Sequence, residues 1–185
     1  MKKLFFAVMI LIFFIGLFLN GVYAGENNPS VTWNNPTKIR TYIPPRHKYT
    51  EKMKRACYRW STMTKNGIIF KYETSPNNAQ IVVYFVEKIP EEFHMDSAAG
   101  LTIYSYAVND GLFRNAKIYI TDYAQGHKLT DDEVFTAMLH ELGHAIGLGH
   151  SNNPNSIMYP TTQHVKTMEV SKEDIDKLAK MYHWR

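Results

Sequence analysis

The residues best suited to carry out chemistry lie in one stretch, residues 140–150, which reads HELGHAIGLGH. His140 and His144 are four residues apart, and on an α-helix this spacing places both imidazole rings on one face, about one turn apart. Two imidazoles placed in this way can bind one Zn²⁺ at roughly 2.0–2.1 Å. Glu141 lies beside the first ligand, where it can reach a metal-bound water rather than the metal. The pattern therefore predicts a zinc site with its own general base.

A third ligand follows the predicted helix. Gly147 is suited to a residue just past a helix end, because such a residue often needs a positive φ, which glycine adopts without steric cost. The chain can then fold back and bring His150 to the same metal. Three neutral imidazoles leave a fourth position for water, as in a catalytic zinc site. The alternative is a solvated helix end with three unrelated histidines.

The pattern His-Glu-x-x-His-x-x-Gly-x-x-His is similar to the signature of the metzincin metallopeptidases. Residues 156–160 read SIMYP, and they resemble the Met-turn that runs beneath the zinc in that clan. The Met-Tyr-Pro form and its distance from His150 resemble the matrixins in particular. The alternative for Met158 is a gap-filling core methionine.

Further site residues follow from the resemblance. It implies that Met158 belongs to the turn beneath the zinc. It also implies that an extended substrate lies along the segment Leu101, Thr102 and Ile103. The tyrosine that the family places shortly after the Met-turn is here Thr162, which implies a substrate pocket of different depth.

Two other parts of the family pattern need separate interpretation. Asp174 matches an acidic residue that braces the Met-turn in matrixins, and the alternative is an ordinary charge in the first turn of a helix. His94 and Asp96 match half of the family's structural zinc site, but the later positions fall near Ser105 and Lys117, which cannot complete such a site. We therefore expect one catalytic zinc, with His94 and Asp96 as loop residues. Calcium sites occur in the family, but no loop here has a clear calcium ligand set.

Composition and the N-terminus indicate where the protein acts. Residues 1–24 have a positive start, an apolar run and a small-x-small end at Ala24, which predict a cleaved signal peptide; the alternative is a retained membrane anchor. The mature chain would carry 19 basic and 17 acidic residues, a balance that gives no argument for nucleic acid or an anionic membrane as a partner. The single cysteine, Cys57, cannot form an internal disulfide, and we expect a buried thiol.

The remaining chain predicts one α+β domain over residues 25–185. Strand-like patterns occupy residues 38–43, 68–72, 79–86, 101–108 and 116–121. Helical patterns occupy residues 49–64 and residues 171–182. A third helix is predicted to begin at a capping box formed by Thr130 and Glu133. The family resemblance implies a zincin-like fold, a twisted mixed five-stranded sheet with three main helices. In a departure from the family pattern, we expect no pro-domain, because the segment between Ala24 and the first strand leaves no room for one.

Together these features predict a secreted, extracellular zinc metalloendopeptidase. We expect a monomer that acts on protein or peptide substrates, without a nucleic-acid partner and without a membrane partner after signal cleavage. Glu141 would act as the general base. One alternative is a zinc hydrolase of another amide, such as a cell-wall peptide. Another is a secreted binding protein that uses zinc only for stability, although a structural site needs no base. A different His-Glu-x-x-His clan would leave Gly147 and His150 unexplained.

Overall fold

The computed structural model describes residues 21–23, 31–95, 97–160 and 170–184. Its strands are β1 Gly21–Tyr23, β2 Ile39–Tyr42, β3 Phe70–Tyr72, β4 Ile81–Phe85, β5 Gly100–Ala107, β6 Leu112–Ile120, β7 Tyr123–Ala124 and β8 His127–Lys128. Its α-helices are α1 Thr50–Met63, α2 Asp131–Ala145 and α3 Lys172–Met181. Short 3₁₀ turns occupy Pro36–Lys38, Pro76–Asn78 and Glu91–Phe93.

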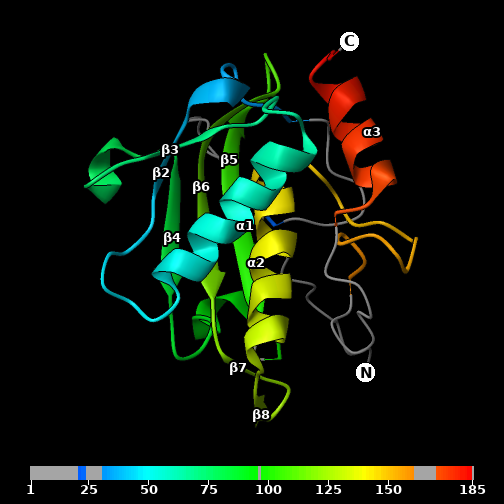
Figure 1. Cartoon of the computed structure of the whole chain (residues 1–185). Helices are drawn as coiled ribbons and strands as arrows, with labels where there is room; N and C mark the ends of the chain where they lie inside the picture. The colour runs from blue at the N-terminus through cyan, green and yellow to red at the C-terminus, as the bar shows by residue number, and fades with distance from the viewer. Residues whose placement is uncertain (1–20, 24–30, 96, 161–169, 185) are drawn as a thin grey trace, which may run out of the picture.

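The predicted mixed sheet and its three helices are confirmed. Strands β5, β6, β4, β2 and β3 lie side by side in that order, with β5 antiparallel to β6 and the other neighbours parallel. β1 adds a short antiparallel strand on the outer side of β5, where Tyr23 is opposite Ile103. Figure 1 shows α1 and α2 side by side across the sheet, with α3 apart from the strands.

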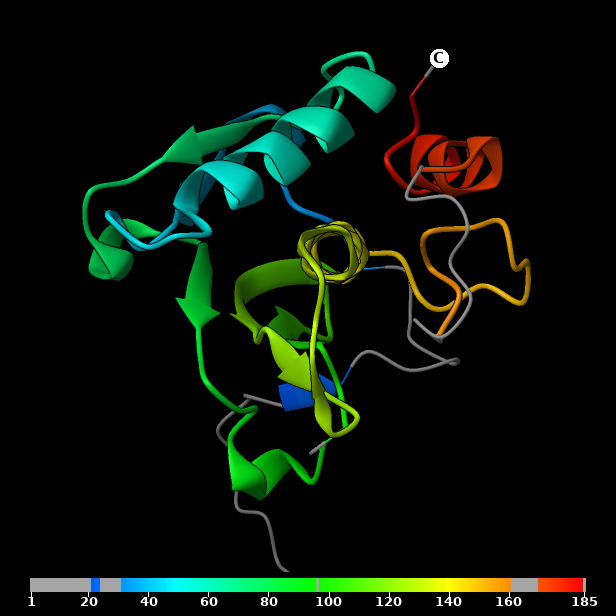
Figure 2. The ribbon, with the colours of Figure 1, turned by 60° about the horizontal axis from the view of Figure 1, so that its bottom comes forward.

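Helices α1 and α2 pack into the core through their apolar residues. The predicted inward stripe of α2 is fully buried: Val134, Met138, Leu142 and Ala145. Trp60 of α1 is also buried, and its indole N–H donates to the carbonyl of Leu139 at 3.0 Å. Figure 2 views α2 almost along its axis, with α1 on one side of it. α2 therefore packs against both α1 and the sheet.

Several boundaries differ from the sequence-based expectations for local reasons. β6 begins at Leu112, earlier than expected, because it forms a hairpin with β5 across a tight turn in which Gly111 has φ +65°. The long loop before β5 contains a 3₁₀ turn, and β7 and β8 form a small second sheet. None of the helices in the described part of the chain combines the length and the apolar character that a membrane span needs.

Candidate active site

The start of α2 is fixed by its capping box. The backbone N–H of Thr130 donates to Glu133 Oε2 at 2.7 Å, and the backbone N–H of Glu133 donates to Thr130 Oγ1 at 3.3 Å. These two backbone N–H groups have no partner within the helix, and the two side chains supply one for each. The capping box predicted from the sequence is confirmed, and it sets the first turn of the helix that carries His140 and His144.

Gly147 ends the helix as predicted, with φ +110°. A Cβ atom at this position would overlap the carbonyl oxygen of Val31 and lie 2.7 Å from Met181 Cε. Glycine is therefore required here both for its backbone conformation and for the close approach of neighbouring segments. The reversal that follows carries His150 back towards α2.

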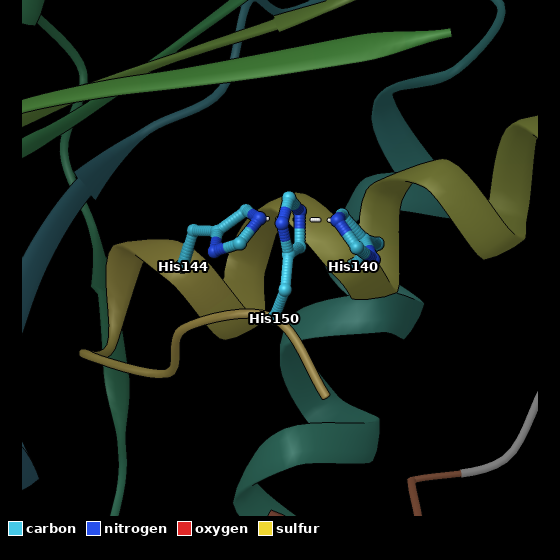
Figure 3. Close-up of side chains that lie close together, drawn as sticks. All are labelled: His140, His144 and His150. Carbon is cyan, nitrogen blue, oxygen red and sulfur yellow. Dashed lines mark hydrogen bonds between the residues drawn. The ribbon is translucent and has the colours of Figure 1, made fainter. Parts of the chain in front are cut away.

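The three histidines converge. Figure 3 shows His140 and His144 projecting from consecutive turns of α2, with the ring of His150 between them. The ring centroids of His140 and His144 are 4.6 Å apart, and His150 lies 5.4 Å from the first and 4.9 Å from the second. One potential ligand nitrogen from each of the three lies within 4.8 Å of the others.

Backbone carbonyls orient two of the rings. His140 Nδ1 lies 2.8 Å from the oxygen of Ile157, and His144 Nδ1 lies 2.8 Å from the oxygen of Leu148. A carbonyl only accepts, so each Nδ1 must donate, which leaves the Nε2 lone pair of each neutral ring directed at the other. These two Nε2 atoms are 3.0 Å apart. Nitrogens bound tetrahedrally to one zinc at 2.0–2.1 Å would be about 3.3 Å apart, so the residues fit the metal.

Burial keeps these rings in the form that binds metal. It lowers the pKa of His140 to about 4, although the contact with the Ile157 carbonyl opposes the shift. Burial also holds the pKa of His144 well below its usual range, and neighbouring His140 acts in the same direction. Both imidazoles are therefore neutral at neutral pH in the metal-free protein, as a ligand requires.

Met158 packs against α2 at Gly143, a position between His140 and His144 in the sequence. Its side chain is buried, and a Cβ atom added to Gly143 would overlap its sulfur. Its carbonyl accepts from the backbone N–H of Ser151 at 2.9 Å, which joins the turn to the segment just past His150. The turn also supplies the Ile157 carbonyl that orients His140.

Asp174 of α3 fulfils both roles that the sequence left open. Its Oδ2 accepts from the backbone N–H and the hydroxyl of Ser171, at 2.9 and 2.7 Å, and so caps α3. Its Oδ1 accepts from the hydroxyl of Ser156 at 2.6 Å, and that hydroxyl accepts from the backbone N–H of Met158 at 2.9 Å. One buried carboxylate therefore connects the last helix to the Met-turn.

Glu141 lies in the wall of a cavity of about 270 Å³, together with the three histidines and Leu101 of β5. Burial raises the pKa of the Glu141 carboxyl to about 7, and a hydrogen bond from the Thr102 hydroxyl opposes this shift. The Thr102 oxygen is 2.7 Å from Glu141 Oε2. A carboxyl with its pKa near neutrality beside a metal-ligand cluster is suited to accept and return a proton.

Of the remaining site residues expected from the sequence, some lie at the cavity and others lie away from it or outside the described residues. Leu101 and Thr102 lie beside the cavity, and the backbone of Ile103 is opposite β1. Thr162 and Asp96 lie outside the described residues. His94 ends a 3₁₀ turn in the loop before β5, as a loop residue. Within the described residues, one group of three or more His, Cys, Asp or Glu could hold a metal, and it is the three-histidine cluster.

The structure shows two contributions to the site that were not predicted from the sequence. One is the Thr102 hydroxyl, which donates to the side chain of Glu141. The other is Gly100, whose missing side chain makes space for the Glu141 carboxylate. The alternation of a strand places both on one face of β5. No local pattern, however, indicates that this face meets residue 141.

Two histidines on a capped helix and a third just past its end, packed with a methionine-containing turn beside a mixed sheet, are the arrangement of a metzincin-type metallopeptidase domain. Residues 26–183 match the matrixin (peptidase M10) family, and the chain belongs to it. Members of this family use zinc, and the histidine cluster fits a zinc site.

Individual relatives agree with this assignment. The chain is 32% identical to rat matrilysin over 165 residues, covering 84% of this chain and 60% of the relative. It is 31% identical to rat macrophage metalloelastase, covering 78% of this chain and 33% of the relative. A soybean (Glycine max) metalloendoproteinase 1 is 26% identical, with 81% and 52% covered. The chain thus spans between a third and three fifths of the length of these relatives.

Proposed function

We propose that this protein is a secreted zinc-dependent endopeptidase. The observation that carries the proposal is the meeting of three histidine imidazoles and the buried Glu141 carboxyl in one cavity beside β5. The three histidines are suited to hold Zn²⁺, and the Glu141 carboxyl is suited to move a proton. A metal site that served only stability would not need a carboxyl of raised pKa in the cavity wall.

The roles of the residues follow from this arrangement. His140, His144 and His150 would hold the metal. Zinc bound there would polarise the scissile carbonyl and lower the pKa of a coordinated water from about 15.7 towards about 7. Glu141 takes a proton from the attacking water and later gives it to the leaving amine. The turn around Met158 would support His140 through the Ile157 carbonyl, and Met158 itself packs against the helix at Gly143.

The substrate would lie extended along β5. Strand addition of this kind uses backbone hydrogen bonds and accepts many sequences. The outer side of β5 already accepts one extended segment, because β1 pairs with residues 103–105 in antiparallel fashion. A substrate at Leu101, Thr102 and Ile103 would use the same kind of pairing nearer the cavity. Thr162 would help to set the depth of the pocket for the residue after the scissile bond.

The localisation is also part of the proposal. Residues 1–24 would be a signal peptide removed after Ala24, and residues 25–185 would form the mature extracellular domain, acting as a monomer. The apolar run before a small-x-small site supports this.

The test compares residues 25–185 with the same protein carrying Glu141→Ala. Each is assayed for bound zinc and for cleavage of a mixed peptide library. The expected result is cleavage by the parent, and zinc binding without cleavage by the variant. If both proteins bind zinc and neither cleaves a peptide, the endopeptidase proposal is wrong. A cell-wall peptide or other amide substrate, or a binding role, would then be tested instead.

A further inference from the structure

Among the described residues, the hydroxyl of Thr102 is directed at Glu141 alone. Its hydroxyl lies 2.7 Å from Glu141 Oε2 and 2.9 Å from the main-chain oxygen of Glu141. Thr102 is only 1% exposed and Glu141 only 6% exposed. A hydroxyl carries one proton to donate, and here both acceptors within reach belong to the same residue. The contact therefore joins β5 to one particular position of α2.

Gly100 completes the other side of this contact. It precedes Thr102 by two residues on β5, so both positions face α2. A Cβ atom at Gly100 would lie 2.6 Å from Glu141 Cγ and 2.9 Å from Glu141 Oε1. The carboxylate thus lies in a slot, with a strand backbone against Oε1 and a hydroxyl on Oε2. Gly100, Thr102 and Glu141 all line the cavity that holds the histidine cluster.

We propose that Thr102 is a positioning residue for Glu141, and that its hydroxyl holds the carboxyl group in the orientation needed for proton transfer. This inference rests on the function proposed above. The terminal torsion of a glutamate is broad, so packing alone does not choose the direction of the two oxygens. Small losses of orientation at a reacting group lower the rate strongly.

A hydroxyl is suited to this task in both protonation states of Glu141. When the Glu141 carboxylate is ionised, the Thr102 hydroxyl donates to Oε2. When the carboxyl takes up the proton on its other oxygen, Oε2 remains an acceptor and still receives the hydrogen bond from the Thr102 hydroxyl. The same hydrogen bond therefore holds the carboxyl before and after the proton is taken up.

The experiment uses residues 25–185 with Thr102→Val, which keeps the shape and removes the hydroxyl, and with Thr102→Ser, which keeps the hydroxyl. Thr41→Val is the matched control. Thr41 is also a fully buried strand threonine, but its hydroxyl donates to the carbonyl of Ile39, away from the cavity. For each protein, kcat and KM for a cleaved peptide, bound zinc and the thermal midpoint are measured.

Thr102→Val should lower kcat about 10- to 100-fold, because a hydrogen bond to a charged group is lost. KM and zinc content should stay within about twofold of the parent, because the lost contact does not touch the metal or the substrate. Thr102→Ser should recover most of the rate, and Thr41→Val should match the parent. Crystals of the metal-free variants should show the Glu141 carboxylate turned from its slot in Thr102→Val only.

Three results would overturn the inference: an unchanged kcat in Thr102→Val, an equal loss in Thr102→Ser, or a loss of zinc or folding in Thr102→Val that Thr102→Ser does not repair. Failure of the proposed function has a different result. In that case the parent itself binds zinc and cleaves no peptide, and the orientation of Glu141 in the crystals still decides whether Thr102 positions it.

Discussion

Gly143 lies against the sulfur of Met158, so closely that a Cβ atom at position 143 would overlap it. The added atom would also lie 3.2 Å from the ring of Trp60. The helix thus has no side chain between the two histidines on the side that faces the Met-turn. This contact sets the distance between α2 and the turn that orients His140.

Gly143→Ala is therefore expected to destabilise the protein. Alanine is favoured over glycine in a helix by about 1 kcal/mol, but overpacking of a buried contact typically costs about 1–3 kcal/mol. We expect a net loss and weaker zinc binding, measured by urea unfolding and metal titration of residues 25–185. Met158→Ala should relieve the overlap. The loss of unfolding free energy in the Gly143→Ala/Met158→Ala double variant should therefore be smaller than the sum of the losses in the two single variants. A more stable Gly143→Ala protein would contradict the contact.

Asp174→Ala should cost more than loss of an ordinary helix cap. The carboxylate is 0% exposed and accepts from both Ser171 and Ser156, so its removal leaves buried donors without a partner. We expect a loss of about 2–4 kcal/mol in the free energy of unfolding. Asp176→Ala is the control on the same helix: its exposed ion pair with Lys172 predicts a change within about 0.5 kcal/mol. Equal effects would show that Asp174 does not brace the turn.

Glu141→Gln should stabilise the metal-free protein at alkaline pH. Burial raises the pKa of Glu141 to about 7 from 4.5, so between these values the folded state holds a proton that the unfolded state has lost. The corresponding stability is present below 4.5 and is lost as the pH rises through about 7. A neutral glutamine avoids that loss, and the gain should be on the order of 1–3 kcal/mol at about pH 8 and small at about pH 5.

Urea midpoints of the parent and Glu141→Gln at the two pH values measure this difference. The buried histidines also titrate, but they are common to both proteins and cancel in the comparison. A gain of equal size at both pH values would show that the glutamine acts through packing rather than through the charge of Glu141.

Cys57 should not react with thiol reagents in the folded protein. Its side chain is 1% exposed in α1, and burial raises the pKa of the thiol to about 12. Both the reactive thiolate and access to it are therefore suppressed at neutral pH. Alkylation followed by mass spectrometry should show labelling only after denaturant is added. Rapid labelling of the native protein would mean that α1 opens readily.

The pairing of β1 with β5 predicts competition with the substrate. Tyr23 is opposite Ile103, the last residue of the proposed substrate segment. A protein that begins at Gly21 should therefore have a higher KM than one that begins at Gly25, with kcat unchanged, because the two segments need the same backbone groups of β5. Peptide cleavage assays on the two proteins measure this. Identical KM values would indicate that the substrate does not reach residue 103.

The sequence by itself determined the parts of this site that depend on neighbouring residues. Helical spacing places His140 and His144 on one face, a capping box begins α2, and Gly147 ends it with a positive φ. These features follow from backbone geometry within a few residues, so they are readable from residue types and offsets. The apolar stripe of α2 and the buried thiol of Cys57 were predicted for the same reason.

Only the tertiary structure decided which distant side chains meet. The contact of Thr102 with Glu141 spans 39 positions, and the contact of Ser156 with Asp174 spans 18. Such contacts depend on how a sheet face, a helix and a turn pack together, and each side chain taken alone has several equally good local roles. Asp174 could cap a helix or brace a turn, and only packing showed that its two oxygens do both.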